Sequence, residues 1–198
     1  MLILGDSISM GYTPWVRELL GGEAVVARAM REDRRENCQG TTFGVQHVER
    51  WVAQDGGDWD VIHFNFGLHD LKHVDPDTGK NSNDPDDPPQ ASPERYEELL
   101  DRIAAALAAT GARPVFATTT PVPDGGVRPY RVDEDVVLYN SIARRVVAAR
   151  GIGVVDLYGF VASQAARLQR PGDVHFTPAG SALLGAKVAA AIRSAARR

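Results

Sequence analysis

The chain has 198 residues, of which 43% are hydrophobic and 24% charged, and its formal net charge is −4. These values are ordinary for a globular protein and exclude a disordered or fibrous chain. The acidic balance and the absence of clustered Lys and Arg argue against a nucleic-acid-binding surface, because phosphate binding needs concentrated positive charge. The single cysteine, Cys38, excludes an intrachain disulfide and any CxxC motif.

The length fits one buried core, so we expect a single domain over residues 1–198. No apolar run approaches the roughly 20 residues of a membrane-spanning helix, and we expect no membrane association. No basic stretch precedes the apolar residues 2–5, as it would in a signal peptide. We therefore expect a cytoplasmic protein, although removal of a signal peptide would leave the same sequence.

Short apolar runs alternate with segments of helical periodicity along the whole chain. The strand-like runs are 2–5, 24–29, 60–66, 113–120 and 153–157. The segments with apolar residues at i, i+3 and i+4 are 14–20, 42–53, 93–110, 135–150 and 158–168, and a final helix over 178–196 begins with proline. Such alternation predicts an α/β fold, in which a five-stranded parallel sheet lies between two helical layers as a three-layer α/β/α sandwich.

Ligands of such folds bind at the carboxyl ends of the strands. The segments that follow the strand-like runs are polar and contain glycine: Asp6 and Ser7, then 36–42, 67–73 and 121–126. The longest irregular segment, 74–93, is rich in Asp, Pro, Asn and Ser and is typical of a lid, a binding loop or a mobile insertion. We expect the chemistry of the protein at this edge of the sheet.

Ser7 follows the first strand-like run directly. It lacks the GxxxxGK[ST] and GxGxxG patterns of phosphate-binding loops, but it could cap the following helix. Acyl transfer by a serine would need a base, a group that orients the base, and N–H donors for the oxyanion. The chain offers His175 just before the last helix, Asp173 two residues ahead of it, and the backbone N–H of Gly40.

Four blocks together resemble the SGNH, or GDSL-type, hydrolase family: "GDSIS" (5–9), "NCQGTT" (37–42), "GLHD" (67–70) and "DVHFTPAG" (173–180). The resemblance implies a flavodoxin-like fold with strand order 2-1-3-4-5. It also implies a serine esterase that needs no cofactor and acts on a small-molecule or carbohydrate ester, often an acetyl ester. By the same resemblance, Ser7 is the nucleophile, His175 the general base, and the N–H groups of Ser7 and Gly40 line the oxyanion hole.

Two positions depart from the family pattern. The third block usually carries an asparagine whose amide donates to the oxyanion, and His69 stands in its place. A neutral imidazole has one N–H and can replace that amide, so we expect His69 in the oxyanion hole, with Asn65 as a spare candidate. The orienting acid usually stands three residues before the histidine, where this chain has Gly172. We expect Asp173, one residue closer, to reach the imidazole, and the alternative is a Ser–His dyad in which a backbone carbonyl orients the ring.

Three other functions stay open on the sequence. His69, Asp70 and His73 in "HDLKH" could hold a metal ion in a metal-assisted hydrolase, although no HExxH pattern is present. His73 could instead line the acyl or sugar pocket, and this substrate-binding role is the one we expect. A non-catalytic carbohydrate-binding protein on the same fold, or acyl transfer to an alcohol, would use the same scaffold.

Overall fold

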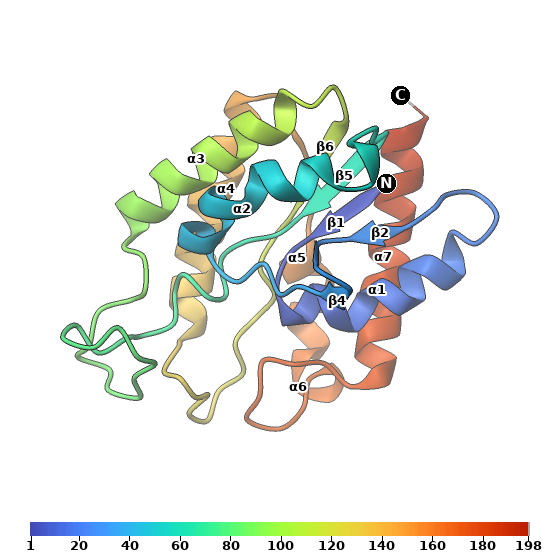
Figure 1. The fold of residues 1–198 in the computed structure, drawn as a ribbon. Helices are drawn as coiled ribbons and strands as arrows, with labels where there is room; N and C mark the ends of the chain where they lie inside the picture. Colours follow the sequence, from blue (N-terminus) through green and yellow to red (C-terminus); the bar gives the residue numbers. More distant parts are fainter. Residues whose placement is uncertain (198) are drawn as a thin grey trace.

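The computed structural model describes residues 1–197 and is built on a five-stranded parallel sheet (Figure 1). The predicted strand order 2-1-3-4-5 is confirmed: the strands lie in the order β2 (Ala27–Arg28), β1 (Leu2–Leu4), β5 (Val61–Phe64), β6 (Arg113–Ala117) and β7 (Gly153–Val155). The three residues of β1 are fully buried. Helices cover both faces of a parallel sheet, which is why its central strands read as continuous apolar runs.

Helices form a layer on each face of the sheet (Figure 1). One layer contains α1 (Ser7–Leu19) and α7 (Pro178–Ala196), and the other contains α2 (Thr41–Ala53), α3 (Pro93–Ala108) and α4 (Asp133–Ala149). This is the predicted three-layer sandwich. No helix within residues 1–197 combines the length and the hydropathy that crossing a bilayer requires.

The predicted helix over 158–168 is broken into three short pieces. These are α5 (Leu157–Val161), the 3-10 turn η2 (Ala162–Gln164) and α6 (Ala165–Leu168). Gln164 leaves the helical region with φ −132°. Val161 and Leu168 are buried, but the residues between them are exposed or half-buried, so no continuous apolar stripe holds the segment against the core.

A small hairpin lies in the charged stretch 31–36. Strands β3 (Met30–Arg31) and β4 (Arg34–Arg35) pair antiparallel, and the 3-10 turn η1 (Gln54–Gly56) follows α2. Glu36 is buried beside the hairpin and accepts a hydrogen bond from Trp51 Nε1 at 2.7 Å. Strands of only two residues are too short to show apolar alternation, so the sequence carries no signal for them.

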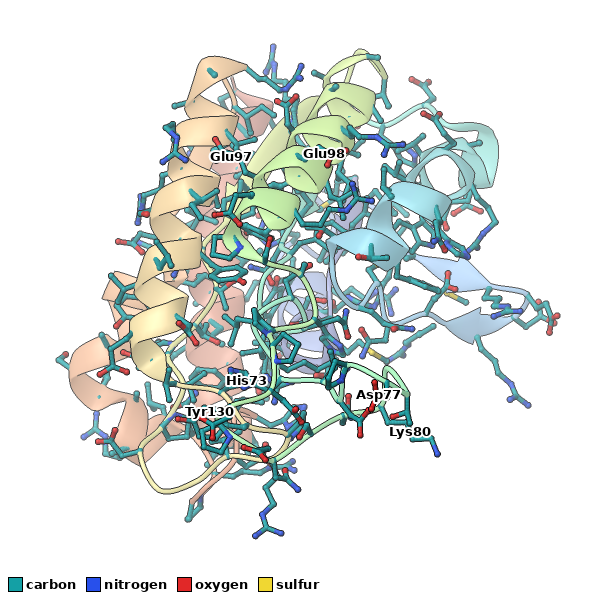
Figure 2. All side chains as sticks on the ribbon, turned by 90° about the vertical axis from the view of Figure 1, so that its left-hand side faces the viewer. His73, Asp77, Lys80, Glu97, Glu98 and Tyr130 are labelled. Atoms are coloured by element: carbon teal, nitrogen blue, oxygen red, sulfur yellow. The ribbon has the colours of Figure 1, made fainter. Side chains whose placement is uncertain are left out.

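The long loop folds back on itself and on residues 121–132. Isolated bridges join Val74 to Asn81 and His73 to Pro89, and the His73 N–H donates to the carbonyl of Tyr130 at 3.0 Å. Figure 2 shows His73 and Tyr130 beside each other, with Asp77 and Lys80 further out on the loop. The loop ends one residue earlier than predicted, because α3 begins at Pro93.

Candidate active site

Ser7 is the first residue of α1, directly after the turn that leaves β1. The helix cap is Asp6, whose carboxylate accepts a hydrogen bond from the Ile8 N–H at 2.9 Å. The Ser7 hydroxyl is therefore not needed as a cap and points to His175 instead, with Oγ 2.8 Å from the imidazole Nε2. The sequence left open whether this serine is a helix cap or a nucleophile, and the structure gives the cap to Asp6.

Asp173 completes a chain of three side chains. Its Oδ1 lies 2.6 Å from Nδ1 of His175 and also accepts the backbone N–H of His175 at 3.1 Å. Partial burial works against ionisation of Asp173, but the hydrogen bonds from His175 and the charge of its ring hold the carboxyl pKa below its usual value. Because an ionised carboxylate only accepts, Nδ1 carries the ring proton and leaves Nε2 as the acceptor for Ser7.

The loop that carries these residues is tied down at both ends. The Arg170 N–H donates to the carbonyl of His175 at 2.8 Å, and Gln169 forms a bridge with Phe176. Gly172 takes φ +63°, the left-handed conformation that glycine adopts without strain. This turn brings Asp173 to the imidazole from only two residues away.

A buried arginine supports the turn beneath Ser7. Arg28 of β2 is 1% exposed, and its guanidinium donates to Ser9 Oγ at 2.7 Å and to the carbonyl of Gly5 at 2.6 Å. It also reaches the carbonyl of Glu36 at 3.3 Å, so it joins the first block to the segment that leads to the second. Burial lowers its pKa, and no carboxylate in residues 1–197 forms an ion pair with it. The sequence reasoning missed this residue, although an arginine inside an apolar strand run was a signal.

The second block approaches the first through the backbone. The Cys38 N–H donates to the carbonyl of Gly5 at 3.1 Å, and Gly40 caps the N-terminus of α2. A Cβ at Gly40 would lie 2.9 Å from Asp70 Oδ1, so only glycine fits there without a shift. As residues at helix starts, Ser7 and Gly40 have backbone N–H groups without intrahelical acceptors.

Asp70 braces this arrangement from the third block. Its Oδ1 accepts the backbone N–H of Thr41 at 2.7 Å and the Thr41 hydroxyl at 2.6 Å. Complete burial raises the pKa of the carboxyl to about 7, even though these hydrogen bonds favour its ionised form. Gly67, at φ +155°, begins the block, and a Cβ there would lie 2.2 Å from Thr119 Oγ1.

His69 stays neutral at neutral pH. Burial is the main cause that lowers its pKa to about 4, and the positive charges of Lys72 and Arg131 act in the same direction. Its Nδ1 is buried without a partner among the described residues. Arg131 Nε donates to the Leu68 carbonyl at 2.8 Å and so holds the segment that carries the imidazole.

Asn65, the spare candidate, is already engaged elsewhere. Its amide donates to the carbonyl of Ala117 at 2.7 Å, within the sheet. Its second N–H is directed to Thr119 Oγ1 at 3.5 Å, so both donors of the amide are engaged. His69 therefore stays the candidate for the third donor.

His73 lies apart from this constellation. Its Nδ1 donates to the carbonyl of Asp84 at 3.1 Å, and its ring meets Tyr130 edge-on at 4.7 Å between centroids (Figure 2). It lines a separate pocket of about 310 Å³, and its substrate-binding role stays a prediction. Within residues 1–197, no three or more His, Cys, Asp or Glu side chains are arranged to hold a metal ion, so "HDLKH" does not assemble a metal centre.

An open groove of about 360 Å³ leads to the serine. Ser7 and His175 lie on its wall, together with the apolar side chains of Trp15 and Phe176 and the guanidinium of Arg170. It runs between α1 and the start of α7, which lie side by side (Figure 1). The arrangement of serine, imidazole, carboxylate and free backbone N–H groups can perform nucleophilic acyl transfer.

Comparisons with known proteins agree with this chemistry. The model of the GDSL-like lipase/acylhydrolase family matches residues 3–183. A comparison with curated proteins finds no match.

Several solved structures share this fold. The acetyl xylan esterase AlAXEase has a TM-score of 0.75 at 16% identity, over 96% of this chain and 98% of its own. A lipase/acylhydrolase from Enterococcus faecalis has a TM-score of 0.74 at 21% identity, over 98% and 94%. TesA has a TM-score of 0.70 at 15% identity, over 98% of each chain.

Proposed function

Because the chain belongs to the GDSL-like lipase/acylhydrolase family and is an SGNH-type ester hydrolase, we propose that it cleaves short acyl esters through an acyl-enzyme on Ser7. The acyl group is acetyl, and the alcohol is a carbohydrate or another polar molecule. The observation that carries this proposal is the hydrogen-bonded series from Ser7 Oγ through His175 to Asp173, at 2.8 and 2.6 Å.

Each catalytic side chain acts at a defined step of the reaction. His175 Nε2 takes the hydroxyl proton of Ser7 while Oγ attacks the ester carbonyl, and the same nitrogen then returns this proton to the departing alcohol. Water, deprotonated by His175, attacks the acyl-enzyme and releases the carboxylic acid and free Ser7. No cofactor takes part in these steps.

Three N–H donors stabilise the negatively charged oxygen of the tetrahedral intermediate. Two are the backbone N–H groups of Ser7 and Gly40, and the third is the ring N–H of neutral His69. One such donor contributes about 3–4 kcal/mol to lowering the barrier. A neutral His69 fits this role across the pH range above its pKa of about 4.

The size of the groove supports a small substrate. Its volume of about 360 Å³ is near the lower end of the ~300–1,000 Å³ range of ligand pockets. A similar fold at a TM-score of 0.75 belongs to a protein described as an acetyl xylan esterase. The groove volume favours a small substrate as a whole, and the acetyl xylan esterase favours acetyl as the acyl group.

The test is hydrolysis of 4-nitrophenyl acetate, butyrate and octanoate, and of acetylated xylan, by the intact protein and by Ser7→Ala. We expect a preference for acetate, a loss of about 10⁴-fold or more in Ser7→Ala, and no effect of EDTA. Ser141→Ala is the control, because this exposed serine of α4 bonds only to its own helix. Activity that survives in Ser7→Ala, or that EDTA removes, would contradict the proposal.

A further inference from the structure

The wall of the catalytic groove carries one permanently charged side chain. Of the described residues that line it, Arg170 is the only one with a fixed charge, and none is a carboxylate. The whole chain, by contrast, carries a net charge of −4. A cation beside the nucleophile in an acidic protein points to the charge of the substrate.

The guanidinium of Arg170 has no partner. No carboxylate lies within 4.0 Å of it and no side-chain hydrogen bond is formed by it within residues 1–197. Other arginines on the surface are paired: Arg150 with Asp101 at 2.7 Å and Arg145 with Glu97 at 2.8 Å. The free donors of Arg170 are therefore available to a ligand.

The backbone of Arg170 is nevertheless held in place. Its N–H donates to the carbonyl of His175 at 2.8 Å, and its carbonyl accepts the N–H of Asp173 at 3.1 Å. The side chain thus starts from the same turn that carries the general base. The charge of Arg170 helps to lower the pKa of the Asp173 carboxyl, but that carboxylate is hydrogen-bonded by His175 and forms no ion pair with the guanidinium within 4.0 Å.

The groove is also lined by an aromatic side chain from α1. Trp15 of α1 is half-buried and lines the groove. Its Cβ packs against Gly185 of α7, where a Cβ of a larger residue would lie only 2.6 Å away. Such an indole presents a rigid apolar face on which a flat or sugar ring can stack.

We infer that the groove binds the alcohol part of the ester, and that this alcohol is a ring-shaped molecule with a carboxylate that pairs with Arg170 while the ring lies against Trp15. Acetylated uronic acids and acetylated hydroxybenzoates share this chemistry. The inference rests on the proposed function, because the substrate's carboxylate reaches Arg170 only when its ester group is bound at Ser7.

Two esters that differ in one charge provide the test: 4-acetoxybenzoate and its methyl ester. The quantity measured is the ratio of their kcat/KM values, anionic over neutral. Because an exposed ion pair is weak, Arg170→Gln is expected to lower the ratio about 1.5-fold to fivefold, and Arg170→Glu, which adds repulsion, about tenfold. Added NaCl is expected to weaken the preference of the intact protein.

The matched control is Arg167→Gln. Arg167 is an exposed arginine of α6 whose guanidinium bonds to Gln164 at 3.0 Å, outside the groove. Its ratio is expected to equal that of the intact protein. If the ratio of kcat/KM values for Arg170→Glu stays within twofold of that for the intact protein, the inference is overturned. The proposed function still holds in that case if hydrolysis is lost in Ser7→Ala. Hydrolysis of both esters by Ser7→Ala would overturn the two together.

Discussion

Replacement of Asp173 separates the two contributions that this carboxylate makes to catalysis. A single oxygen, Oδ1, accepts both the ring Nδ1–H and the backbone N–H of His175, at 2.6 and 3.1 Å. The amide oxygen of Asp173→Asn can accept the same two bonds, so it retains the orientation of the ring and loses only the charge. Asp173→Ala loses both.

The exposure of the pair determines the expected magnitude. Asparagine in place of the buried aspartate of a serine protease triad costs about 10⁴-fold in kcat, because it leaves the histidine in the wrong tautomer. In Asp173→Asn the backbone N–H of His175 keeps the amide oxygen towards Nδ1–H, which preserves the tautomer. Here the side chains of His175 and Asp173 are 41% and 37% exposed, so water screens the carboxylate. We therefore expect a loss of about 10²–10³-fold in Asp173→Ala, or about 3–4 kcal/mol. Asp173→Asn is expected to lose only about tenfold, because a charged hydrogen bond exceeds a neutral one by about 1 kcal/mol.

The assay is kcat/KM for 4-nitrophenyl acetate at pH 8, with circular dichroism to establish that each variant is folded. Asp58→Asn, an exposed aspartate before β5, is the control for charge removal. Activity of Asp173→Ala within threefold of the intact protein would show that the site is a Ser–His dyad. A larger loss in Asp173→Asn than in Asp173→Ala would refute the reasoning about the shared oxygen.

Three further predictions concern buried polar groups. His69→Ala is expected to lower kcat for 4-nitrophenyl acetate by about 10²–10³-fold, and His69→Asn is expected to retain most of the kcat of the intact protein. An unchanged kcat in His69→Ala would show that this imidazole is not part of the oxyanion hole. Asp70→Ala is expected to lower the free energy of unfolding, measured in urea, by about 1–2 kcal/mol, because the first turn of α2 loses its hydrogen-bond acceptor. Asp70→Asn is expected to lower it less. Equal stability of the two variants would show that the Asp70 side chain does not cap α2. Burial, and then the charge of Arg28, lower the pKa of His63 to about 3. Between pH 3 and 6.5 the unfolded chain therefore binds a proton at His63 that the native state does not, so stability rises with pH. Urea unfolding at pH 4.5–6 is expected to show that His63→Gln reduces this slope by about 1.4 kcal/mol per pH unit; an unchanged slope would mean that His63 is protonated in the folded state.

The sheet was predictable because its central strands β1 and β5 are buried on both faces. The ends of the strands were not. The run 113–120 is apolar or β-branched from Pro114 onward, but β6 stops at Ala117. Thr118 and Thr119 bond instead to side chains of other elements: the Thr118 hydroxyl to Asp156 at 3.0 Å and the Thr119 N–H to Asn140 at 2.8 Å. Such partners are distant in sequence, so local periodicity carries no sign of them.

The candidate site was predictable where a residue type and its place after a strand carry the chemistry, as for Ser7 and His175. The reach of Asp173 depends on a turn at Gly172, which spacing alone does not determine. Arg28 and Arg170 were missed for different reasons. Arg28 stands in an apolar run that invites an ordinary strand interpretation, and Arg170 is an exposed arginine whose lack of a partner only the three-dimensional arrangement shows.

Covalent labelling of the nucleophile tests the central claim most directly. The intact protein and His175→Ala would be treated with phenylmethylsulfonyl fluoride, and the modified peptide identified by mass spectrometry. Our account predicts one adduct, on Ser7, that forms in step with the loss of esterase activity and much more slowly in His175→Ala. Loss of activity with Ser7 unmodified, or an adduct on another residue, would contradict it.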